Sequence, residues 1–533
     1  MTTLNVDCLH YLFKSFSEEQ DGCDLLYTCT LLNREWGDLA TRYLYKDPWK
    51  YWLYQMKDGA VAKLLIDTYM SCYKYNVSKN KRRASLPTRK GEEEESPYKK
   101  IVMEYGEDEV DDDHRLPTYN YITFANNLHV PSLYQCVKKW YMSYNSECDE
   151  NDENDLQTIY DYFIKIFNLF VQEANIKYCT FGESTEDDSY PITIDQLDRL
   201  VNCGKRVNLE YLNLGYFQCD SEGLSKITNK CNNLRTFKIS AQRCSDEALA
   251  RFIRSQNHLT KLKIRNAEKI DLTLESLGTQ SDSLVKLRIL NSNLESCKQP
   301  FDGIAACSKL RSIYMRMISW SANVTSSTLL MPIAKRCEFH NIDFSNTYLP
   351  ADVLIEIAKK SSSTLRKVHL LGTDDHSDHE KFNLSAGIKA LADHCKNIVH
   401  FERDIIPKEI TSMIYFIDTI GKSLVRLEIE SKFMKNTDSS RLIISISYCP
   451  KLEILNINYF QFDSRALERL IIGCKSLASL SICRSNSVND DILRIIQEKR
   501  SGNLKSLDIL ACEKVTEDAV EKLRDETDIE VDY

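Results

Sequence analysis

The sequence predicts an α/β solenoid preceded by a small three-helix domain. Three observations support this fold class: an apolar pattern that recurs twelve times between Leu209 and Ile509, helical apolar spacing after several recurrences, and a separate helical pattern near the N-terminus. A repeat of this kind is too short to bury its own apolar face, so each repeat must stack on the next. We therefore expect one continuous core along the array.

Each recurrence places apolar residues at its first, fourth and sixth positions. The triplets are Leu209/Leu212/Leu214, Leu234/Phe237/Ile239, Leu259/Leu262/Ile264, Leu284/Leu287/Ile289, Leu310/Ile313/Met315, Phe339/Ile342/Phe344, Leu365/Val368/Leu370, Ile398/Phe401/Arg403, Leu424/Leu427/Ile429, Leu452/Leu455/Ile457, Leu477/Leu480/Ile482 and Leu504/Leu507/Ile509. Only Arg403 breaks the pattern. The mean period of about 27 residues is typical of leucine-rich repeats. With a strand at each triplet and helices such as 246–253 and 463–472 between strands, residues 206–533 are predicted to form an α/β leucine-rich-repeat horseshoe.

The first fifty residues carry three amphipathic helical faces. The residues of these faces are Val6, Leu9, Leu12, Phe13 and Phe16, then Leu25, Leu26, Cys29 and Leu32, then Trp36, Leu39, Ala40, Tyr43 and Leu44. This spacing indicates a three-helix domain at residues 1–50.

Residues 4–13, 24–29, 32–36 and 44–49 together resemble an F-box, as in fungal F-box and leucine-rich-repeat proteins, although Asn5-Val6 stands where the family has Leu-Pro. The resemblance implies a substrate receptor of an SCF-type cullin-RING ubiquitin ligase, in which the F-box docks on a Skp-family adaptor and the repeats bind a protein for degradation. The implied adaptor-binding residues are Val6, Leu9, Leu12, Phe13, Leu32, Asn33 and Trp36. The alternative is a protein-interaction scaffold that works outside ubiquitination.

Between the two patterns, residues 51–116 are predicted to be a linker. Residues 76–115 combine a basic run, acidic runs and few apolar residues, a composition typical of disorder. Ser85 follows Arg82-Arg83-Ala84, which resembles a site for basophilic kinases, so Ser85 is a candidate phosphorylation site beside the alternative of a plain solvated linker. Residues 117–205 are predicted to be degenerate repeats that cap the solenoid, with an acidic loop at 147–155.

Composition and motifs argue against catalysis and against membrane insertion. The net charge of -9 comes from acidic runs at 92–95, 107–113 and 147–155, and the sequence contains no phosphate-binding loop and no hydrolase or zinc-protease motif. The acidic and histidine-rich stretch 374–380 is predicted to be a solvated loop rather than a metal site. We expect no enzyme activity, no cofactor and no metal.

Cysteine placement indicates a reducing compartment. The chain has 19 cysteines without a Cys-x-x-Cys motif, and five of them stand three residues before a triplet: Cys231, Cys307, Cys395, Cys449 and Cys474. This position favours a small buried side chain rather than a disulfide or metal ligand. With no apolar run long enough for a membrane and no leader-like start, we expect a cytoplasmic or nuclear protein.

Solvent-facing strand positions predict a bipolar binding surface. Cations gather on four successive strands, at Lys238, Lys261, Lys263, Arg265, Lys286, Arg288 and Arg316. Glu402, Asp404, Glu428 and Glu430 follow further along, beside His400 and Arg426. Crowded cations favour an anionic ligand, so we hypothesise an acidic or phosphorylated protein segment as substrate. The alternative is a solvated strand face. Nucleic acid is an unlikely ligand because no nucleic-acid module is present.

Overall fold

The computed structural model describes residues 5–19, 22–54, 59–84, 119–145, 148, 152–182, 193–202, 208–217, 219–320, 324–372, 383–430, 438–500 and 504–533. Their contacts divide the chain into two compact units. The N-terminal unit comprises Met1–Phe217 with Lys226–Leu234, and the repeat unit comprises Gln218–Ser225 with Arg235–Tyr533. Among the helices in these ranges, none has the length and hydropathy that crossing a bilayer requires.

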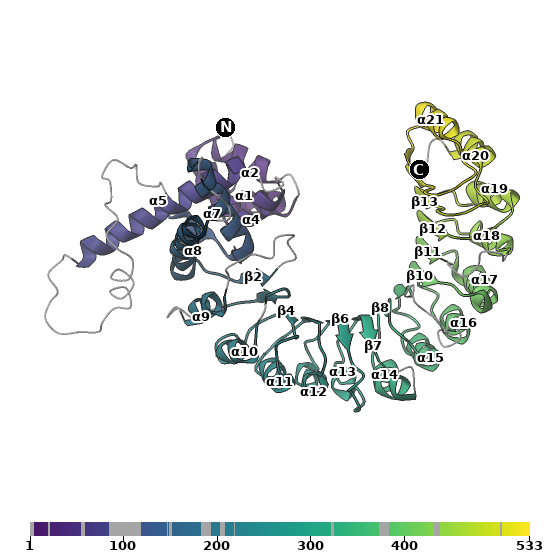
Figure 1. The fold of residues 1–533 in the computed structure, drawn as a ribbon, viewed down its shortest axis with the longest axis horizontal. Helices are drawn as coiled ribbons and strands as arrows, with labels where there is room; N and C mark the ends of the chain where they lie inside the picture. Colours follow the sequence, from purple (N-terminus) through teal and green to yellow (C-terminus); the bar gives the residue numbers. More distant parts are fainter. Residues whose placement is uncertain are drawn as a thin grey trace. The chain divides into compact units, whose positions relative to one another are not determined.

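The N-terminal unit begins with the three predicted helices, α1 (Val6–Glu18), α2 (Gly22–Thr30) and α3 (Arg34–Leu44) (Figure 1). The Asn33 side chain accepts a hydrogen bond from the Trp36 amide and so caps α3. Leu9, Phe13 and Leu26 are buried between the helices with Leu39, and the ring of Trp36 packs edge-on against Phe13. The helical spacing in the sequence therefore predicted these buried residues, whereas Val6, Leu25 and Leu32 of the predicted faces are exposed.

The predicted linker is wrong for much of its length. Helix α4 (Pro48–Tyr54) is followed by the long helix α5 (Gly59–Ala84), which runs through residues expected to be linker and even into the stretch expected to be disordered. One face of α5 is fully buried, at Ala62, Ile66, Tyr69 and Cys72. These positions follow helical spacing, which indicates a helix. The linker prediction relied instead on the average composition of the whole segment, which the charged residues after α5's buried face dominate. Residues 85–118, including Ser85, lie outside the described residues.

The boundary predicted at residue 50 also moves, because the three helices share a unit with the segment predicted to be a cap. The indole of Trp49 is buried against Phe170, with 5.7 Å between ring centroids, and its Nε1 donates to the Asn127 carbonyl at 2.9 Å. Tyr69 packs against the same Phe170 at 5.0 Å. The N-terminal helices are therefore one part of a larger unit.

The segment after residue 117 alternates strands and helices, as a degenerate repeat would. Its elements are η1 (Tyr121–Phe124), β1 (Asn127–His129), α7 (Val130–Tyr144), α8 (Glu153–Glu173), β2 (Tyr178–Gly182), α9 (Ile194–Asn202) and β3 (Tyr211–Leu214), and β1, β2 and β3 pair in parallel. The acidic loop predicted at 147–155 ends early. Asp152 caps α8 by accepting from the amides of Asn154 and Asp155, because acidic side chains stabilise a helix N-terminus.

The repeat unit is an α/β leucine-rich-repeat solenoid. Twelve strands of the described residues follow one another in parallel, in sequence order: β4 (Thr236–Ser240), β5 (Lys261–Arg265), β6 (Lys286–Asn293), β7 (Ser312–Ser319), β8 (Asn341–Asp343), β9 (Lys367–Leu370), β10 (His400–Asp404), β11 (Arg426–Glu430), β12 (Ile454–Asn458), β13 (Ser479–Ser481), β14 (Ser506–Asp508) and β15 (Glu530–Asp532). Within this unit the strands line the concave side and the helices the convex side (Figure 1).

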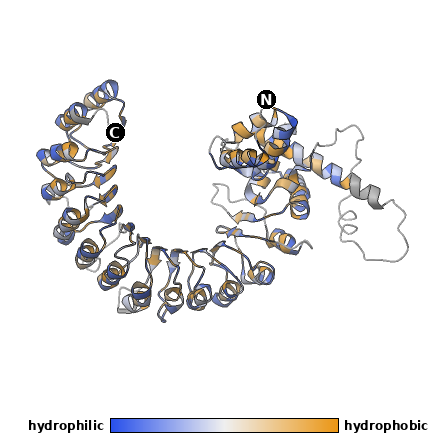
Figure 2. Cartoon of the chain, turned by 180° about the vertical axis from the view of Figure 1, so that it is seen from behind, coloured by the Kyte–Doolittle hydropathy of each residue, from blue (hydrophilic) through white to orange (hydrophobic). Residues whose placement is uncertain are grey.

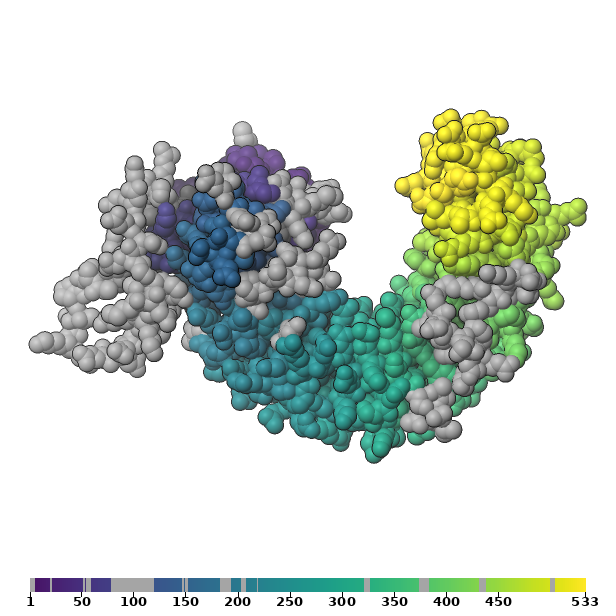
Figure 3. All heavy atoms as spheres, in the orientation of Figure 1, coloured from purple at the N-terminus to yellow at the C-terminus, as the bar shows by residue number. Residues whose placement is uncertain are grey.

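Helical segments connect these strands. They are α10 (Ser221–Thr228), α11 (Asp246–Arg254), α12 (Asp271–Ser276), η2 (Leu277–Gln280), α13 (Asp302–Ala305), α14 (Val324–Arg336), α15 (Ala351–Lys360), α16 (Ser385–His394), η4 (Pro407–Glu409), α17 (Ile410–Ile420), α18 (Ser440–Ile446), α19 (Ser464–Gly473), α20 (Asp490–Arg500) and α21 (Glu517–Glu526). Successive repeats of this unit pack directly against one another (Figure 3).

The triplets form the core of the array, as predicted. Every apolar triplet residue is buried, and hydrophobic residues occupy both strands and helices of the repeats (Figure 2). The first triplet, which begins at Leu209, belongs by its contacts to the N-terminal unit. The five cysteines before triplets are also buried, and burial raises the pKa of Cys231, Cys307 and Cys395 to about 12. They behave as small core residues.

Arg403 occupies its triplet position without leaving the core. Its guanidinium reaches the buried Glu409 carboxylate at 2.9 Å (Nη2 to Oε1) and 3.2 Å (Nε to Oε2), and its Nη1 donates to the Leu370 carbonyl at 3.1 Å. Glu409 Oε1 also accepts from the Leu384 amide at 2.6 Å. A buried, two-pronged ion pair therefore replaces the missing apolar residue.

Candidate functional site

One line of side chains runs across the concave face of the repeat unit. It consists of the residue between the second and third triplet positions of each repeat from Leu234 onward, continued by Asp532 on β15. Strand pairing places these residues in register: Lys238, Lys263, Arg288, Tyr314, Asp343, His369, Glu402, Glu428, Asn456, Ser481, Asp508 and Asp532. We call this line the central row. Neighbouring strands lie about 4.8 Å apart, so the row starts with three cations in close succession.

The start of the row lies in a wider cationic patch, formed by Lys238, Lys261, Lys263, Arg265, Lys286 and Arg288. Burial together with the neighbouring charges of Arg265, Lys238 and Arg288 lowers the pKa of Lys263 to about 8. Among the described residues, no carboxylate lies within 4 Å of the Lys263 or Arg288 side chains in an ion pair. The sequence therefore predicted the crowding of these cations correctly.

Tyr314 forms the far edge of the cationic patch. The Lys286 ammonium and the Arg288 guanidinium each lie 4.7 Å from the centroid of its ring. Such cation–π contacts stabilise the positive charges only in part, at about 0.5–2 kcal/mol each. An aromatic ring between cations also offers a flat surface to a bound chain.

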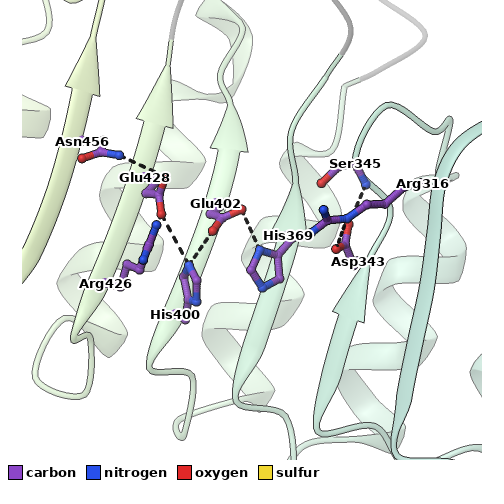
Figure 4. Close-up of polar contacts among 9 residues, drawn as sticks. All are labelled: Arg316, Asp343, Ser345, His369, His400, Glu402, Arg426, Glu428 and Asn456. Atoms are coloured by element: carbon purple, nitrogen blue, oxygen red, sulfur yellow. Dashed lines mark hydrogen bonds and ion pairs between the residues drawn. The ribbon is translucent and has the colours of Figure 1, made fainter. Parts of the chain in front are cut away.

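Arg316 does not belong to the cationic patch, contrary to the prediction. Its Nε forms an ion pair with Oδ2 of Asp343, whose side chain is completely buried (Figure 4). The other Asp343 oxygen accepts from the Ser345 amide at 3.1 Å. The predicted patch included only four strands, of which that of Arg316 is the last. Asp343 lies on the next strand, so the prediction did not take its charge into account. Arg316 therefore serves to neutralise a buried carboxylate.

The second half of the central row is acidic, as predicted, but it is compensated by its neighbours. Glu402 lies between two imidazoles, with 2.6 Å from its Oε2 to His369 Nδ1 and 2.6 Å from its Oε1 to His400 Nε2 (Figure 4). Glu428 forms an ion pair with Arg426 Nε and accepts a hydrogen bond from Asn456 Nδ2 at 3.0 Å. The acidic half is thus a network of opposite charges and hydrogen bonds.

The charges of this network follow from the same contacts. Burial raises the pKa of Glu402, but hydrogen bonds and the positive charges of His369 and His400 outweigh burial and hold it well below its usual range. Burial lowers the pKa of His400, and Glu402 and Glu428 outweigh this effect and raise it. Glu402 and His400 therefore stabilise one another in their charged forms.

The sequence did not single out His369 as part of any site. His369 and Glu402 stand 33 residues apart and become cross-strand neighbours only through the pairing of β9 with β10. Aligning the repeats position by position would have brought the two together. The stretch 374–380, predicted to be a solvated loop, lies outside the described residues.

The predicted adaptor-binding residues separate into buried and exposed groups. Leu9 and Phe13 are 1% and 0% exposed, so they are core residues of the three helices rather than surface contacts. Leu12 and Trp36 are partly buried against that core, and Asn33 caps α3. Helical spacing alone does not distinguish a face that packs inside a domain from one that binds a partner.

Apolar exposure on the three helices is instead found at Val6, Tyr11, Leu25, Tyr27, Leu31 and Leu32. Leu31 and Leu32 are 71% and 58% exposed and lie in the turn between α2 and α3. Sequence reasoning found Val6 and Leu32 but not Leu31. The signal was available, because two adjacent leucines in a tight turn cannot both follow the buried face of α2.

Comparisons with known proteins find no matching family model and no matching curated protein. Among solved structures, the chain is similar to one from the crystal structure of the Rad7 and Elc1 complex in yeast, with 14% identity, coverage of 73% of this chain and 90% of that chain, and a TM-score of 0.41. It is also similar to an internalin (inlF) from Listeria monocytogenes, with 14% identity, coverage of 74% and 94%, and a TM-score of 0.32. At this level of similarity, the leucine-rich-repeat fold rests on the chain's own strands, helices and buried triplets.

Proposed function

We propose that the repeat unit binds an acidic or phosphorylated segment of another protein on the cationic patch. The observation that carries this proposal is the in-register succession of Lys238, Lys263 and Arg288 on three adjacent strands. Like charges directly opposite one another destabilise a sheet. A bound anion relieves that repulsion, and ion pairs with phosphate or carboxylate groups are among the stronger hydrogen-bonded contacts.

The test uses the full chain and fluorescent peptides rich in glutamate or phosphoserine. Lys263→Glu with Arg288→Glu is expected to weaken binding about tenfold or more, because loss and reversal of charge at a contact costs well over 1 kcal/mol. Lys298→Glu with Lys309→Glu is the matched control, since both lysines are exposed and lie outside the strands of the same region. Added salt should weaken binding to the wild type.

Equal binding by the patch variant and the control variant would remove the cationic patch from recognition. Such a result would support the alternative of a merely solvated strand face. If only the phosphoserine peptides bind, the cationic patch recognises phosphate groups. If the glutamate peptides bind as well, it recognises negative charge in general.

We further propose that the chain is a non-catalytic substrate receptor of an SCF-type cullin-RING ubiquitin ligase, acting in the cytoplasm or nucleus. Support comes from the resemblance of the first fifty residues to an F-box and from exposed apolar side chains on these helices, such as Val6, Leu31 and Leu32. Exposed leucines on a small helical unit suit docking on a Skp-family adaptor, where their burial would contribute about 1.5–3 kcal/mol each.

Co-purification with the Skp-family adaptor tests this role. Leu31→Asp with Leu32→Asp should abolish adaptor capture, whereas Leu64→Asp should not, because Leu64 is a 70% exposed leucine on α5 of the same unit. Point variants are preferable to deletion of residues 1–49, which would also remove the buried Trp49 from the core. Absence of adaptor from wild-type preparations would refute the docking role.

A scaffold outside ubiquitination is the second candidate function. The two functions differ in what happens to the protein bound by the repeats. In a ligase, Leu31→Asp with Leu32→Asp should lengthen the half-life of the bound protein in cells. In a scaffold, the half-life should stay the same while binding to the repeats persists.

A further inference from the structure

The imidazoles of His369 and His400 and the carboxylate of Glu402 come together on two paired strands, β9 and β10 (Figure 4). Their potential ligand atoms all lie within 4.8 Å of one another. The two rings meet edge to face with 4.5 Å between centroids. From this arrangement we propose a binding site for a divalent transition-metal ion of the zinc class on the concave face, separate from the cationic patch.

The donor set selects the class of ion. Two imidazole nitrogens and one carboxylate are typical ligands of zinc, whereas calcium and magnesium prefer oxygen ligands throughout. Tetrahedral coordination at bond lengths of about 2.0–2.2 Å separates ligand atoms by roughly 3.3–3.6 Å. The present separations differ from this by about 1 Å, a distance that side-chain rotation can close.

The backbone holds the three residues firmly. Glu402 and His369 are direct partners in the parallel ladder, and His400 stands two residues before Glu402 on the same face of the strand. All three side chains are largely covered, with 10–13% of their surface exposed. Ligands fixed on regular strands are better positioned for an ion than ligands on loops.

His400 supplies a second, independent observation. Its Nε2 is buried and faces two carboxylates, with Glu402 Oε1 2.6 Å away and Glu428 Oε1 3.7 Å away. Negative charge on both sides of a buried nitrogen favours a cation at that place. Coordination of an ion by this nitrogen would place the cation beside both carboxylates.

The surroundings leave one coordination position open. Glu428 is held by Arg426 and by Asn456 Nδ2, so its carboxylate already has partners of its own. The three ligands occupy solvent-facing strand positions, and the remaining position therefore opens on the concave side. Water or a donor group of a bound protein can fill it, as in three-ligand zinc sites.

The test uses the full chain after treatment with a chelator, with Zn²⁺ and Co²⁺ as probes. Competition with a chromophoric chelator should show that the wild type binds one additional Zn²⁺ ion tightly, compared with His369→Gln or Glu402→Gln. Each substitution should weaken this binding by at least about 100-fold, since even outer partners of a metal typically contribute 10–100-fold. His394→Gln, at an exposed histidine on α16, is the matched control and should bind as the wild type does.

The free cysteines of the chain are the competing ligands, and Co²⁺ distinguishes them. Binding at the proposed site should give tetrahedral visible bands without sulfur-to-metal charge transfer. Thiolate bands that persist unchanged in His369→Gln would place the ion on cysteines and overturn the proposal. A second measurement needs no variant: Zn²⁺ should raise the Tm of the wild type, and a chelator should reverse the rise. No such shift, with equal Zn²⁺ binding in wild type and variants, would also overturn it.

Discussion

Replacing Glu409 by glutamine isolates the contribution of the buried ion pair with Arg403. Glutamine keeps the shape of the side chain and still accepts the hydrogen bond from the Leu384 amide, which lies 2.6 Å from Oε1. It removes the negative charge opposite a guanidinium whose side chain is 6% exposed, and its NH2 group replaces the oxygen that accepts from Arg403 Nε. The substitution therefore leaves a buried positive charge without its counter-charge.

The expected cost is large because both groups are buried. Removing one partner of a buried ion pair typically costs about 3–5 kcal/mol, whereas replacing both partners by well-packed apolar residues of similar volume is often close to neutral. Arg403→Leu with Glu409→Gln restores the apolar triplet of the repeat, and we expect its local stability within about 1 kcal/mol of the wild type. The double variant should therefore be about 2–4 kcal/mol more stable than Glu409→Gln alone.

Hydrogen exchange is the suitable assay, because repeat arrays can open locally rather than in one cooperative step. Exchange in peptides covering residues 383–409 should accelerate in Glu409→Gln and recover in the double variant. Glu356→Gln is the control, since it breaks an exposed pair with Lys359 that contributes about 0–1 kcal/mol. Equal acceleration in the single and double variants would mean that the pair is not coupled, and the reasoning would be refuted.

Three shorter predictions concern charge, thiol reactivity and packing. Binding of an anionic peptide should weaken as pH rises through about 8, because Lys263 then loses its charge, and Lys263→Gln should flatten this profile in a fluorescence titration. A thiol reagent should modify the exposed Cys8 well before the buried Cys307, whose pKa burial raises to about 12, as peptide mass spectrometry would show. Gly303→Ala should lower the free energy of unfolding by about 1–3 kcal/mol, because its Cβ would lie 2.2 Å from a backbone oxygen. Gly278→Ala is the control and should be tolerated, since the nearest atom to its Cβ would be 3.8 Å away. Equal melting temperatures of the two variants would contradict this prediction.

The sequence predicted best what depends on periodicity. A triplet such as Leu262/Ile264 repeats in every strand, and burial of the second and third residues follows from the alternation of side chains in a strand. Arg403 could not be interpreted in this way, because periodicity says nothing about the polar partner that a buried charge needs. That partner, Glu409, is only six residues away, but nothing in its surroundings marks it as buried.

The sequence was least informative in two situations. In one, the prediction relied on the average composition of a segment; in the other, an apolar helix face could either pack inside its own domain or bind a partner. Helix α5 was missed because the charged stretch beyond it outweighed a regular face that contains Ile66 and Tyr69. Leu9 was assigned to a binding surface because self-packing and docking require the same helical spacing. The cluster around His369 was missed for a third reason, since it exists only once the register of two strands is known.

The two halves of the central row differ in how their charges are satisfied, and this difference points to where a ligand binds. Glu402 and Glu428 lie against histidines, Arg426 and Asn456, so each of these two carboxylates has a partner within the chain. At the other end, the ring of Tyr314 lies against Arg288, and burial together with repulsion from Arg265, Lys238 and Arg288 lowers the pKa of Lys263 to about 8. Because solvent-facing strand positions can change without disturbing the buried triplets, packing does not require three successive cations there. An anion bound there would stabilise the positive charges of Lys263 and Arg288.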